Sequence, residues 1–487
     1  FPEDFHAYAA YVHSGAEGNP FLLQDYSTSE PQRGSYVILY FSLLALLVRF
    51  TGLSIDVLWN VGRFFLILAL GLMMWKFTRI LFTSERERFL AYALGMLGGG
   101  LGGIIFVAGK FIPFFSRIYS TDMTYYLGYS TFGFMFHPLA MVSLIFTLAC
   151  VYFLHVHLTT KQTKYAFFSG ACALLAFFNH PAGGMIALGI FYLTMLWELY
   201  RSRGPALLQK TRTLLLSIIF PGGVVLLYLL WARQDFVYAF HQSYYLFLDK
   251  REPLIGYMLG LGIPLELAAY ALFTRRMFRD AHTQMLILTW FVLAAVASLA
   301  LPAGVKYLYM LAFPVAALGA LGLIHFVPRL HLQFPALGMR HVTLVLLLIC
   351  ISSVPFLIYS RVSEVATQES RHFLSFDEEV ALIFLDTQEK GVVLSESRIG
   401  SIISYRAPQR PYLAHGFLTI DYKEKQQALV AFYNPSTPAA EKKALLDKYG
   451  ITLVFYGDDE RALGPVPTGI GLVSIWSQNN VTLYRVP

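Results

Sequence analysis

The sequence predicts a polytopic α-helical membrane protein with a soluble α/β domain at its C-terminal end. Of the 487 residues, 56% are hydrophobic and only 14% are charged, a composition that excludes an ordinary soluble enzyme. Apolar runs long enough to cross a bilayer recur as far as residue 360. Beyond that point, amphipathic helical patterns alternate with short apolar strands.

These patterns divide the chain into three segments. We expect a first outer loop with interfacial helices over residues 1–55, a transmembrane domain over residues 56–360, and an α/β domain over residues 361–487. Within the first segment, the apolar run SYVILYFSLLALLVRF at 35–50 is followed closely by another span, so it predicts a helix lying along the membrane surface. The chain starts abruptly on polar residues, so we expect further residues upstream.

The transmembrane domain predicts about ten spans. They lie near residues 57–79, 89–108, 133–157, 164–181, 183–200, 211–232, 254–274, 284–301, 304–326 and 342–360. The run GGGLGG at 98–103 lacks the Lys-Ser/Thr of a phosphate-binding loop and falls inside a span, where small residues serve close helix packing.

Charged residues in the loops set the orientation. Alternate loops hold most of the cations, namely Lys76, Arg79, Arg86, Arg88, Lys161, Lys164, Arg201, Arg203, Lys210, Arg212, Arg275, Arg276, Arg279, Arg329 and Arg340. Because short loops rich in Lys and Arg stay cytoplasmic, both termini are expected to face outward. The net charge of +7 therefore reflects topology, and no nucleic-acid partner is needed to explain it.

The C-terminal segment predicts a small domain with its own core. GVVLS and ITLVFYG are typical of buried strands, and VSIWSQNNVTLYRV is typical of a terminal hairpin. FDEEVALIFLDTQEK, RIGSIISYRA, DYKEKQQALVAFY and TPAAEKKALLDKYG have the spacing of amphipathic helices. This alternation indicates an α/β domain outside the membrane.

The N-terminal stretch carries the chemistry that suggests a family. FPEDFHAYAAYVHSGAEGNPF places Glu3, Asp4 and His6 ahead of YVILYFSLLALLVRFTGLS and a span that includes Arg63. This order resembles the first outer loop of the GT-C membrane glycosyltransferases, especially the protein O-mannosyltransferase and aminoarabinose-transferase branch. The likeness covers residues 1–80 well and the topology loosely. The tail, PYLAHGFLTIDYKEKQQALVAFY and KYGITLVFYGDDE, also looks like the outer domain of GT-C-like bacterial membrane proteins.

The resemblance implies transfer of a sugar from a polyprenyl-phosphate carrier to an acceptor at the extracytoplasmic face of the plasma membrane. A loop carboxylate would accept the proton of the attacking acceptor hydroxyl, while cations or a divalent metal ion would stabilise the departing phosphate. Asp4 is the first candidate for the base and Glu3 the second, because the order here is Glu-Asp rather than the usual Asp-Glu. Membrane lipids, the lipid-linked sugar and proteins bound to the outer domain are the expected partners.

Further candidates follow from polar residues near the outer face. Lys306 lies just inside the outer surface, where it would meet the carrier phosphate or extend to the interface, and Arg63 would bind phosphate or pair with Asp56. Four histidines are candidates for substrate contacts or for packing and helix-capping roles: His6, His137, His180 and His241. No His-rich cluster accompanies them, so the sequence predicts no metal site.

Two other classes stay open. A noncatalytic GT-C-like scaffold, or a subunit of a larger membrane complex, is favoured by the absence of the Lys-Pro-Pro signature of the aminoarabinose branch, where this chain has EPQRGSY. A secondary transporter would show internal repeats and broken midplane helices. Pro221 and Pro264 interrupt spans, but the sequence contains no matching halves.

Overall fold

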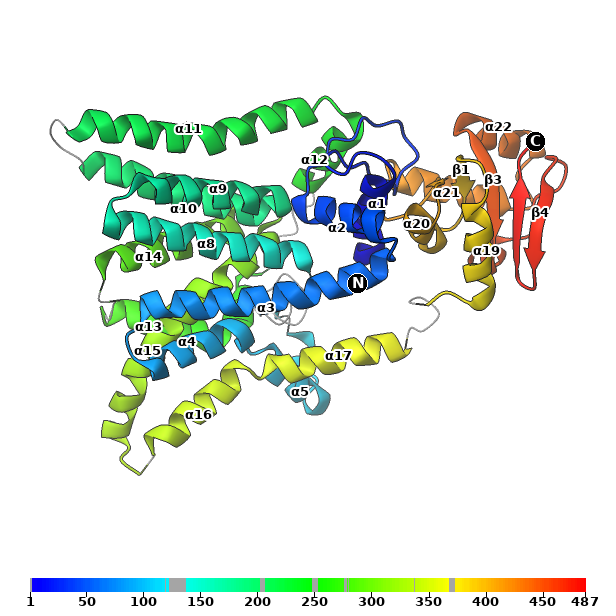
Figure 1. The fold of residues 1–487 in the computed structure, drawn as a ribbon. Helices are drawn as coiled ribbons and strands as arrows, with labels where there is room; N and C mark the ends of the chain where they lie inside the picture. The colour runs from blue at the N-terminus through cyan, green and yellow to red at the C-terminus, as the bar shows by residue number, and fades with distance from the viewer. Residues whose placement is uncertain are drawn as a thin grey trace. The chain divides into compact units, whose positions relative to one another are not determined.

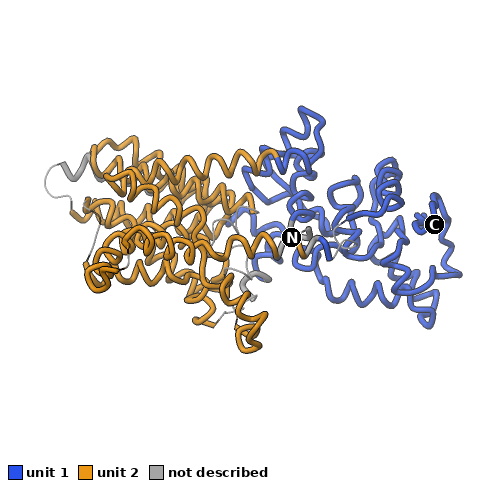
Figure 2. The backbone as a smooth tube through the Cα atoms, turned by 90° about the horizontal axis from the view of Figure 1, so that it is seen from below, with its two compact units in different colours: residues 1–60, 229–244, 364–487 blue, residues 61–228, 245–363 orange. Residues whose placement is uncertain are grey.

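The computed structural model describes residues 2–118, 120–121, 137–201, 206–247, 253–275, 278, 280–336, 338–367 and 373–487. The chain forms two compact units, each assembled from segments that are distant in the sequence (Figure 2). Unit 1 contains residues 1–60, 229–244 and 364–487, and unit 2 contains residues 61–228 and 245–363. The N-terminal segment and the C-terminal domain therefore belong to one unit.

The described part of unit 2 is helical (Figure 1). Its elements are α3 (Ile55–Leu81, which begins in unit 1), α4 (Glu85–Leu97), α5 (Gly102–Phe111), η1 (Phe115–Arg117), α8 (Pro138–Thr160), α9 (Thr163–Asn179), α10 (Pro181–Arg201), α11 (Ala206–Ala232), α13 (Leu254–Phe273), α14 (Ala281–Ala300), η2 (Gly304–Leu311), α15 (Ala312–Gln333), α16 (Met339–Cys350) and α17 (Ser353–Thr367). Among the described residues, seven helical segments are long and apolar enough to cross a membrane, or up to nine if each of two bent pairs is one span.

The predicted number of spans was about ten, and the difference lies in α9. This helix covers the predicted span 164–181 but has only 17 residues. At 1.5 Å per residue it extends about 26 Å, which is short of the roughly 30 Å hydrocarbon core. The predicted spans 89–108 and 211–232 belong to the two bent pairs. The chain direction changes by 56° between α4 and α5, and by 108° between α11 and the helix that starts at Phe236.

Glycines allow the break between α4 and α5 to pack directly on other backbone segments. The amide of Leu101 donates to the carbonyl of Leu259 at 2.8 Å, and the amide of Gly99 donates to the carbonyl of Cys350 at 2.7 Å. A Cβ atom on Gly100 would lie 2.3 Å from the carbonyl oxygens of Leu259 and Gly260. The close packing predicted for this glycine run is therefore present, and it satisfies backbone groups that a membrane interior cannot hydrate.

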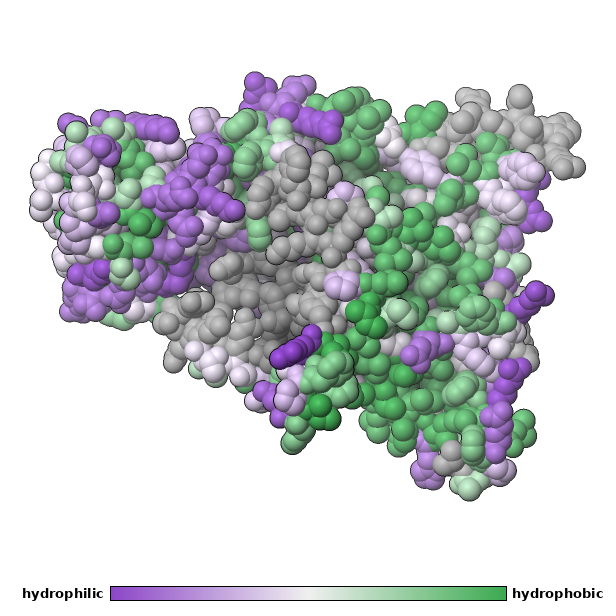
Figure 3. Space-filling model, turned by 180° about the vertical axis from the view of Figure 1, so that it is seen from behind, coloured by the Kyte–Doolittle hydropathy of each residue, from purple (hydrophilic) through white to green (hydrophobic). Residues whose placement is uncertain are grey.

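The outer surface of unit 2 is apolar. Large hydrophobic side chains of α3 are exposed, including Phe64, Phe65 and Leu72. Figure 3 shows hydrophobic residues gathered over a broad face of the helical unit. Because an aqueous surface rarely carries apolar patches of such extent, this face fits contact with lipid chains, and the chain is a membrane protein with multiple spanning helices.

Unit 1 combines three helices with an α/β domain. The helices are α1 (Pro2–Glu17), α2 (Leu39–Thr51) and α12 (Phe236–Phe247). The domain contains α19 (Phe376–Asp386), β1 (Val392–Leu394), α20 (Ser397–Arg406), β2 (Arg410–Pro411), α21 (Tyr422–Tyr433), α22 (Ala439–Lys448), β3 (Ile451–Tyr456), α23 (Asp458–Leu463), β4 (Val473–Gln478) and β5 (Val481–Arg485). The predicted α/β domain and its terminal hairpin are thus confirmed.

The sheet of this domain has the order β2-β1-β3-β5-β4. β1 is parallel to β2 and β3, while β5 is antiparallel to β3 and β4. The core is formed by buried residues that include Leu394, Tyr412, Phe432, Tyr433 and Val454. Parallel strands joined through helices and a closing hairpin produce a domain large enough to bury its own core.

Helix α2 has one buried and one exposed apolar face. Phe41 and Leu44 are buried, whereas Leu43 and Phe50 are exposed. Gly52 ends the helix in the left-handed conformation with φ of 68°, which favours glycine. A short helix that is apolar on both faces fits the predicted position along the membrane surface.

Candidate functional site

The acidic pair lies at the start of α1. The helix begins at Pro2, so Glu3 and Asp4 occupy its first turn rather than its N-cap position. Negative charge in the first turn is favoured by the helix dipole. The side chains of both residues lie outside the part of the chain that the structure describes, so their assignment as catalytic groups stays a prediction.

His6 follows one turn later and packs against the α/β domain. Its ring lies 5.3 Å from that of Tyr405 in α20, in an edge-to-face arrangement. Burial, with smaller contributions from His415 and Arg406, lowers the pKa of His6 to about 3. The buried Nδ1 atom has no hydrogen-bond partner among the described residues. A neutral imidazole of this kind can offer one hydrogen bond to a substrate but no charge to a phosphate.

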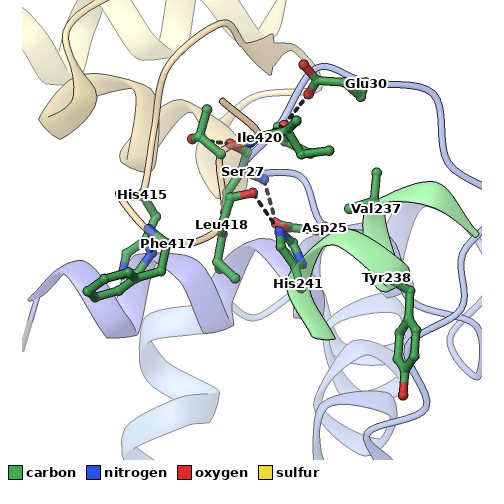
Figure 4. Close-up of polar contacts among 12 residues, drawn as sticks. Asp25, Ser27, Glu30, Val237, Tyr238, His241, His415, Phe417, Leu418 and Ile420 are labelled. Carbon is green, nitrogen blue, oxygen red and sulfur yellow. Dashed lines mark hydrogen bonds and ion pairs between the residues drawn. The ribbon is translucent and has the colours of Figure 1, made fainter. Parts of the chain in front are cut away.

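His241 on α12 lies in a fully buried polar cluster (Figure 4). Its Nε2 atom is 2.9 Å from the carbonyl oxygen of Leu418, and its Nδ1 atom contacts the hydroxyl of Tyr36. Because a carbonyl oxygen only accepts, Nε2 carries a proton, and Nδ1 can accept the hydroxyl proton of Tyr36. This burial favours a structural role for His241 over direct substrate contact.

Asp25 completes the same cluster. Its Oδ2 atom lies 3.7 Å from Nε2 of His241, and its Oδ1 atom accepts from the amide of Ser27 at 2.8 Å. The side chain is completely buried, and burial raises the pKa of the Asp25 carboxyl, an effect that His241 and Ser27 oppose. The cluster joins α12, the loop between α1 and α2, and the segment after β2 of the α/β domain.

Two of the predicted histidines meet in unit 2. His137 is the N-cap of α8, where its side chain accepts from the amide of Ala140, and His180 follows the end of α9. Their ring centroids are 5.7 Å apart. Nδ1 of His180 is 2.8 Å from the hydroxyl oxygen of Tyr309 in η2. The ends of α8, α9 and η2 thus bring two imidazoles and a phenol together.

Lys306 lies in the same 3₁₀ helix as Tyr309, three residues earlier. Residues i and i+3 of a 3₁₀ helix share a face, so Lys306 lies on the face of η2 that carries Tyr309. Lys306 is half-buried. The structure therefore gathers four polar groups of unit 2, which we call the His–Tyr–Lys cluster: His137, His180, Lys306 and Tyr309.

The turn NHPAGG is explained by this cluster. Pro181 begins α10 directly after His180, so the glycines lie in the helix rather than in a loop. A Cβ atom on Gly183 would lie 2.1 Å from the hydroxyl oxygen of Tyr309, and one on Gly184 would lie 2.0 Å from the Cα atom of Phe177. The glycines therefore let Tyr309 and α9 approach α10 closely.

Arg63 and Asp56 both belong to α3. Arg63 is half-buried in the third turn of α3. The carboxylate of Asp56, which the sequence offered as its partner, lies 3.3 Å from the guanidinium of Arg406 in α20. Asp56 thus pairs with the α/β domain of its own unit.

Metal binding finds little support in the described residues. No group of three or more His, Cys, Asp or Glu side chains among them could hold a metal ion.

Sequence reasoning missed Tyr309, Tyr36 and Asp25. Tyr309 could have been found from the sequence, because it follows Lys306 by three residues and residues with this spacing share one face of a 3₁₀ helix. Asp25 and Tyr36 meet α12 across some two hundred residues of chain, and no local pattern marks such a contact.

Comparison with known proteins gives a likeness of fold. No protein-family model and no curated protein matches the sequence. The apo crystal structure of the Archaeoglobus fulgidus oligosaccharyltransferase aligns with a TM-score of 0.52 at 14% identity, covering 93% of this chain and 66% of that chain. The archaeal oligosaccharyltransferase AglB from Archaeoglobus fulgidus, in complex with an inhibitory peptide and a dolichol-phosphate, aligns with a TM-score of 0.50 at 14% identity, covering 93% and 65%.

A crystal structure of the same oligosaccharyltransferase with Zn and sulfate aligns with a TM-score of 0.50 at 13% identity, covering 93% of this chain and 63% of that chain. The chain therefore spans about two thirds or slightly less of the length of these enzymes. The aligned part includes nearly all of this chain. The chain accordingly has the fold of the GT-C membrane glycosyltransferases, with a small α/β domain at its C-terminal end.

Proposed function

We propose that the chain transfers a sugar from a polyprenyl-phosphate carrier to an acceptor at the extracytoplasmic face of the plasma membrane. The observation that carries this proposal is the His–Tyr–Lys cluster, in which His137 and Tyr309 lie beside His180 and Lys306 shares a face of η2 with Tyr309. Such a set matches the needs of a phosphate that gains negative charge as it leaves the sugar. The dolichol-phosphate bound to AglB supports a lipid phosphate as the ligand of this fold.

The reaction is a displacement at the anomeric carbon. The acceptor hydroxyl oxygen attacks that carbon, and the bond between the carbon and the phosphate oxygen breaks, so that its electron pair leaves with the phosphate. Lys306 stabilises this charge, His137 and His180 orient the phosphate oxygens, and Tyr309 holds the ring of His180. Asp4, or Glu3 in its place, accepts the acceptor proton. Arg63 is a further candidate for the phosphate. His6 packs on Tyr405 and His241 contacts the α1–α2 loop, so both position α1 and its loop rather than bind substrate.

The proposal also covers the branch of GT-C enzymes that the chain resembles and the partners that it would contact. The first-loop motif favours the protein O-mannosyltransferase and aminoarabinose-transferase branch. Membrane lipids surround unit 2, and the C-terminal domain lies outside the membrane, where it offers a surface for protein partners.

Binding of a radiolabelled polyprenyl phosphate to the full chain in lipid nanodiscs tests the phosphate site. We expect Lys306→Met to weaken binding about tenfold or more, the effect of losing one charged hydrogen-bonding partner. Lys164→Met is the matched control, because Lys164 stands at the opposite, cation-rich end of its predicted span and should leave binding unchanged. Equal binding by both variants would refute the phosphate site.

Transfer from polyprenyl-phosphate sugars tests the catalytic pair. The double variant Glu3→Gln with Asp4→Asn should lose transfer while it still binds the lipid phosphate. Unchanged transfer would show that the base lies elsewhere. Lipid binding by the unaltered chain without transfer from any donor would instead support the noncatalytic scaffold.

A further inference from the structure

The loop between α1 and α2, residues 18–38, contacts α1, the start of α12 and the α/β domain. Ser14 of α1 accepts from the amide of Gln24 at 3.0 Å, and Leu23 pairs with Tyr36 to close the loop on itself. Toward α12, the amide of Arg33 donates to the carboxylate of Asp235 at 2.8 Å. This loop therefore connects the helix that carries the acidic pair to the rest of the unit.

The α/β domain holds the loop through side chains that are far from it in sequence. The hydroxyl of Thr419 donates to the carbonyl of Ser27 at 2.9 Å, and the amide of Ile420 donates to the hydroxyl of Thr28 at 3.2 Å (Figure 4). The guanidinium of Arg410 lies 3.5 Å from the ring centroid of Tyr26 and donates to Gln24 at 2.6 Å. These contacts belong to the domain rather than to the membrane helices.

Lys425 of α21 forms an ion pair with Glu30 of this loop. Its Nζ atom lies 2.6 Å from Oε1 of Glu30, and its side chain is 1% exposed. The ammonium also lies 5.4 Å and 5.8 Å from the ring centroids of Tyr412 and Tyr449. A lysine so buried needs its carboxylate partner, because the two rings alone replace little of its hydration.

We propose that Lys425 is a positioning residue for the transfer reaction: by holding Glu30, it fixes the α1–α2 loop and thereby α1, which carries Glu3 and Asp4. The inference rests on the proposed function. This role gives the C-terminal domain a part in the reaction. A base that is displaced from hydrogen-bond distance of the acceptor hydroxyl loses much of its catalytic effect. The α1 helix is held at its end as well, where Arg49 donates to the carbonyl of Ala16 at 2.8 Å.

Lys425→Met in the full chain in nanodiscs tests this role. Methionine keeps most of the apolar volume between the two tyrosines, and Glu30 is 20% exposed and can take up water. Lys423→Met is the matched control, because Lys423 is an exposed residue of the same helix. Two quantities are measured: amide hydrogen exchange of residues 18–38, and kcat with KM for the lipid donor.

We expect Lys425→Met to speed exchange in the loop and to lower kcat about tenfold or more, with KM for the donor nearly unchanged. Lys423→Met should change neither. Glu30→Gln keeps an acceptor for Lys425 and should give a smaller change in the same direction, and it replaces Lys425→Met if that variant does not fold. The double variant should lose no more than Lys425→Met alone, because both remove one contact.

The outcomes separate the two proposals. Unchanged kcat in Lys425→Met, whether or not loop exchange rises, would overturn the positioning role while leaving the proposed function intact. A parallel loss of kcat and thermal stability in both lysine variants would likewise overturn it in favour of a general effect on folding. Absence of transfer by the unaltered chain would overturn the proposed function, and the positioning role with it.

Discussion

The Nδ1 atom of His180 and the hydroxyl oxygen of Tyr309 lie 2.8 Å apart, although 129 residues separate them in the sequence. If Tyr309 donates in this bond, Nε2 of His180 carries the proton and can donate to a phosphate oxygen. Tyr309→Phe should therefore weaken polyprenyl phosphate binding severalfold, about the effect of one hydrogen bond. Tyr307→Phe, two residues away, is the control. Equal affinities for both variants would separate Tyr309 from the phosphate site.

A substitution at Gly183 tests the position of the Tyr309 hydroxyl without changing Tyr309 itself. Its missing Cβ would lie 2.1 Å from the Tyr309 hydroxyl oxygen. Gly183→Ala should therefore displace Tyr309 and weaken phosphate binding at least as much as Tyr309→Phe does. The affinity for a labelled polyprenyl phosphate checks this expectation. Wild-type affinity in Gly183→Ala would mean that the Tyr309 side chain can move without loss.

Acid should destabilise unit 1 through His6. The pKa of His6 is lowered from 6.5 to about 3 in the folded chain. Between these two pH values His6 is protonated in the unfolded chain and neutral in the folded chain. The stability contributed by neutral His6 is present above pH 6.5 and is lost as pH falls toward 3. Between pH 7 and pH 5 the loss should be about 2 kcal/mol.

Thermal melting of the full chain in nanodiscs at pH 7 and pH 5 measures this loss. His6→Gln cannot take up the proton, so its melting temperature should fall less between the two pH values. His331→Gln, which alters a histidine near the end of α15, serves as the control. The same pH dependence in all three proteins would exclude His6 as its source.

The break between α4 and α5 should tolerate no side chain at Gly100. A Cβ there would meet two carbonyl oxygens at 2.3 Å, so Gly100→Ala should cost several kcal/mol or prevent folding. Gly223→Ala is the matched control, because nothing lies within 4 Å of a Cβ on this helical glycine. Alanine there should be neutral or stabilise α11 by up to about 1 kcal/mol. Melting temperatures in one detergent check both, and similar values would argue against the close backbone contact.

Arg410 should require a planar cation. Its guanidinium stacks on Tyr26 at 3.5 Å and donates to Gln24, and a lysine ammonium reproduces neither the stacking nor the fork of donors. Arg410→Lys should lower stability by about 1–2 kcal/mol. Arg485→Lys, at an exposed arginine that donates to Gln388, should change it little. Thermal melting of the two variants provides the comparison, and equal stabilities would count against the stacked contact.

The sequence predicts most elements of this fold because their signals are local. Apolar length marks helices such as α8 and α15, and the Gln478–Asn480 turn marks the β4–β5 hairpin. Positions that depend on other segments are less predictable. The bend after Leu97 arises where Gly100 meets α13, and the pairing of Asp56 with Arg406 crosses 350 residues.

The candidate site shows the same division. Lys306, His137 and His180 could be found because each is a polar residue at the end of an apolar run. Their association with Tyr309 could not be foreseen, since it depends on how η2 packs beside α10. His241 had the same local pattern as His180, yet Asp25 and Tyr36 surround it in a buried cluster.

The discontinuous make-up of unit 1 has a consequence for biogenesis. Its first segment ends at residue 60, but the α/β domain that completes its contacts begins after residue 364. A ribosome therefore releases α1 and its loop long before Arg410 and Lys425 are synthesised. The N-terminal segment therefore cannot form its contacts with the α/β domain until translation nears its end. Contacts between segments so distant in the sequence also form slowly. Truncations near the C-terminus should therefore leave the earliest part of the nascent chain exposed to proteases and chaperones.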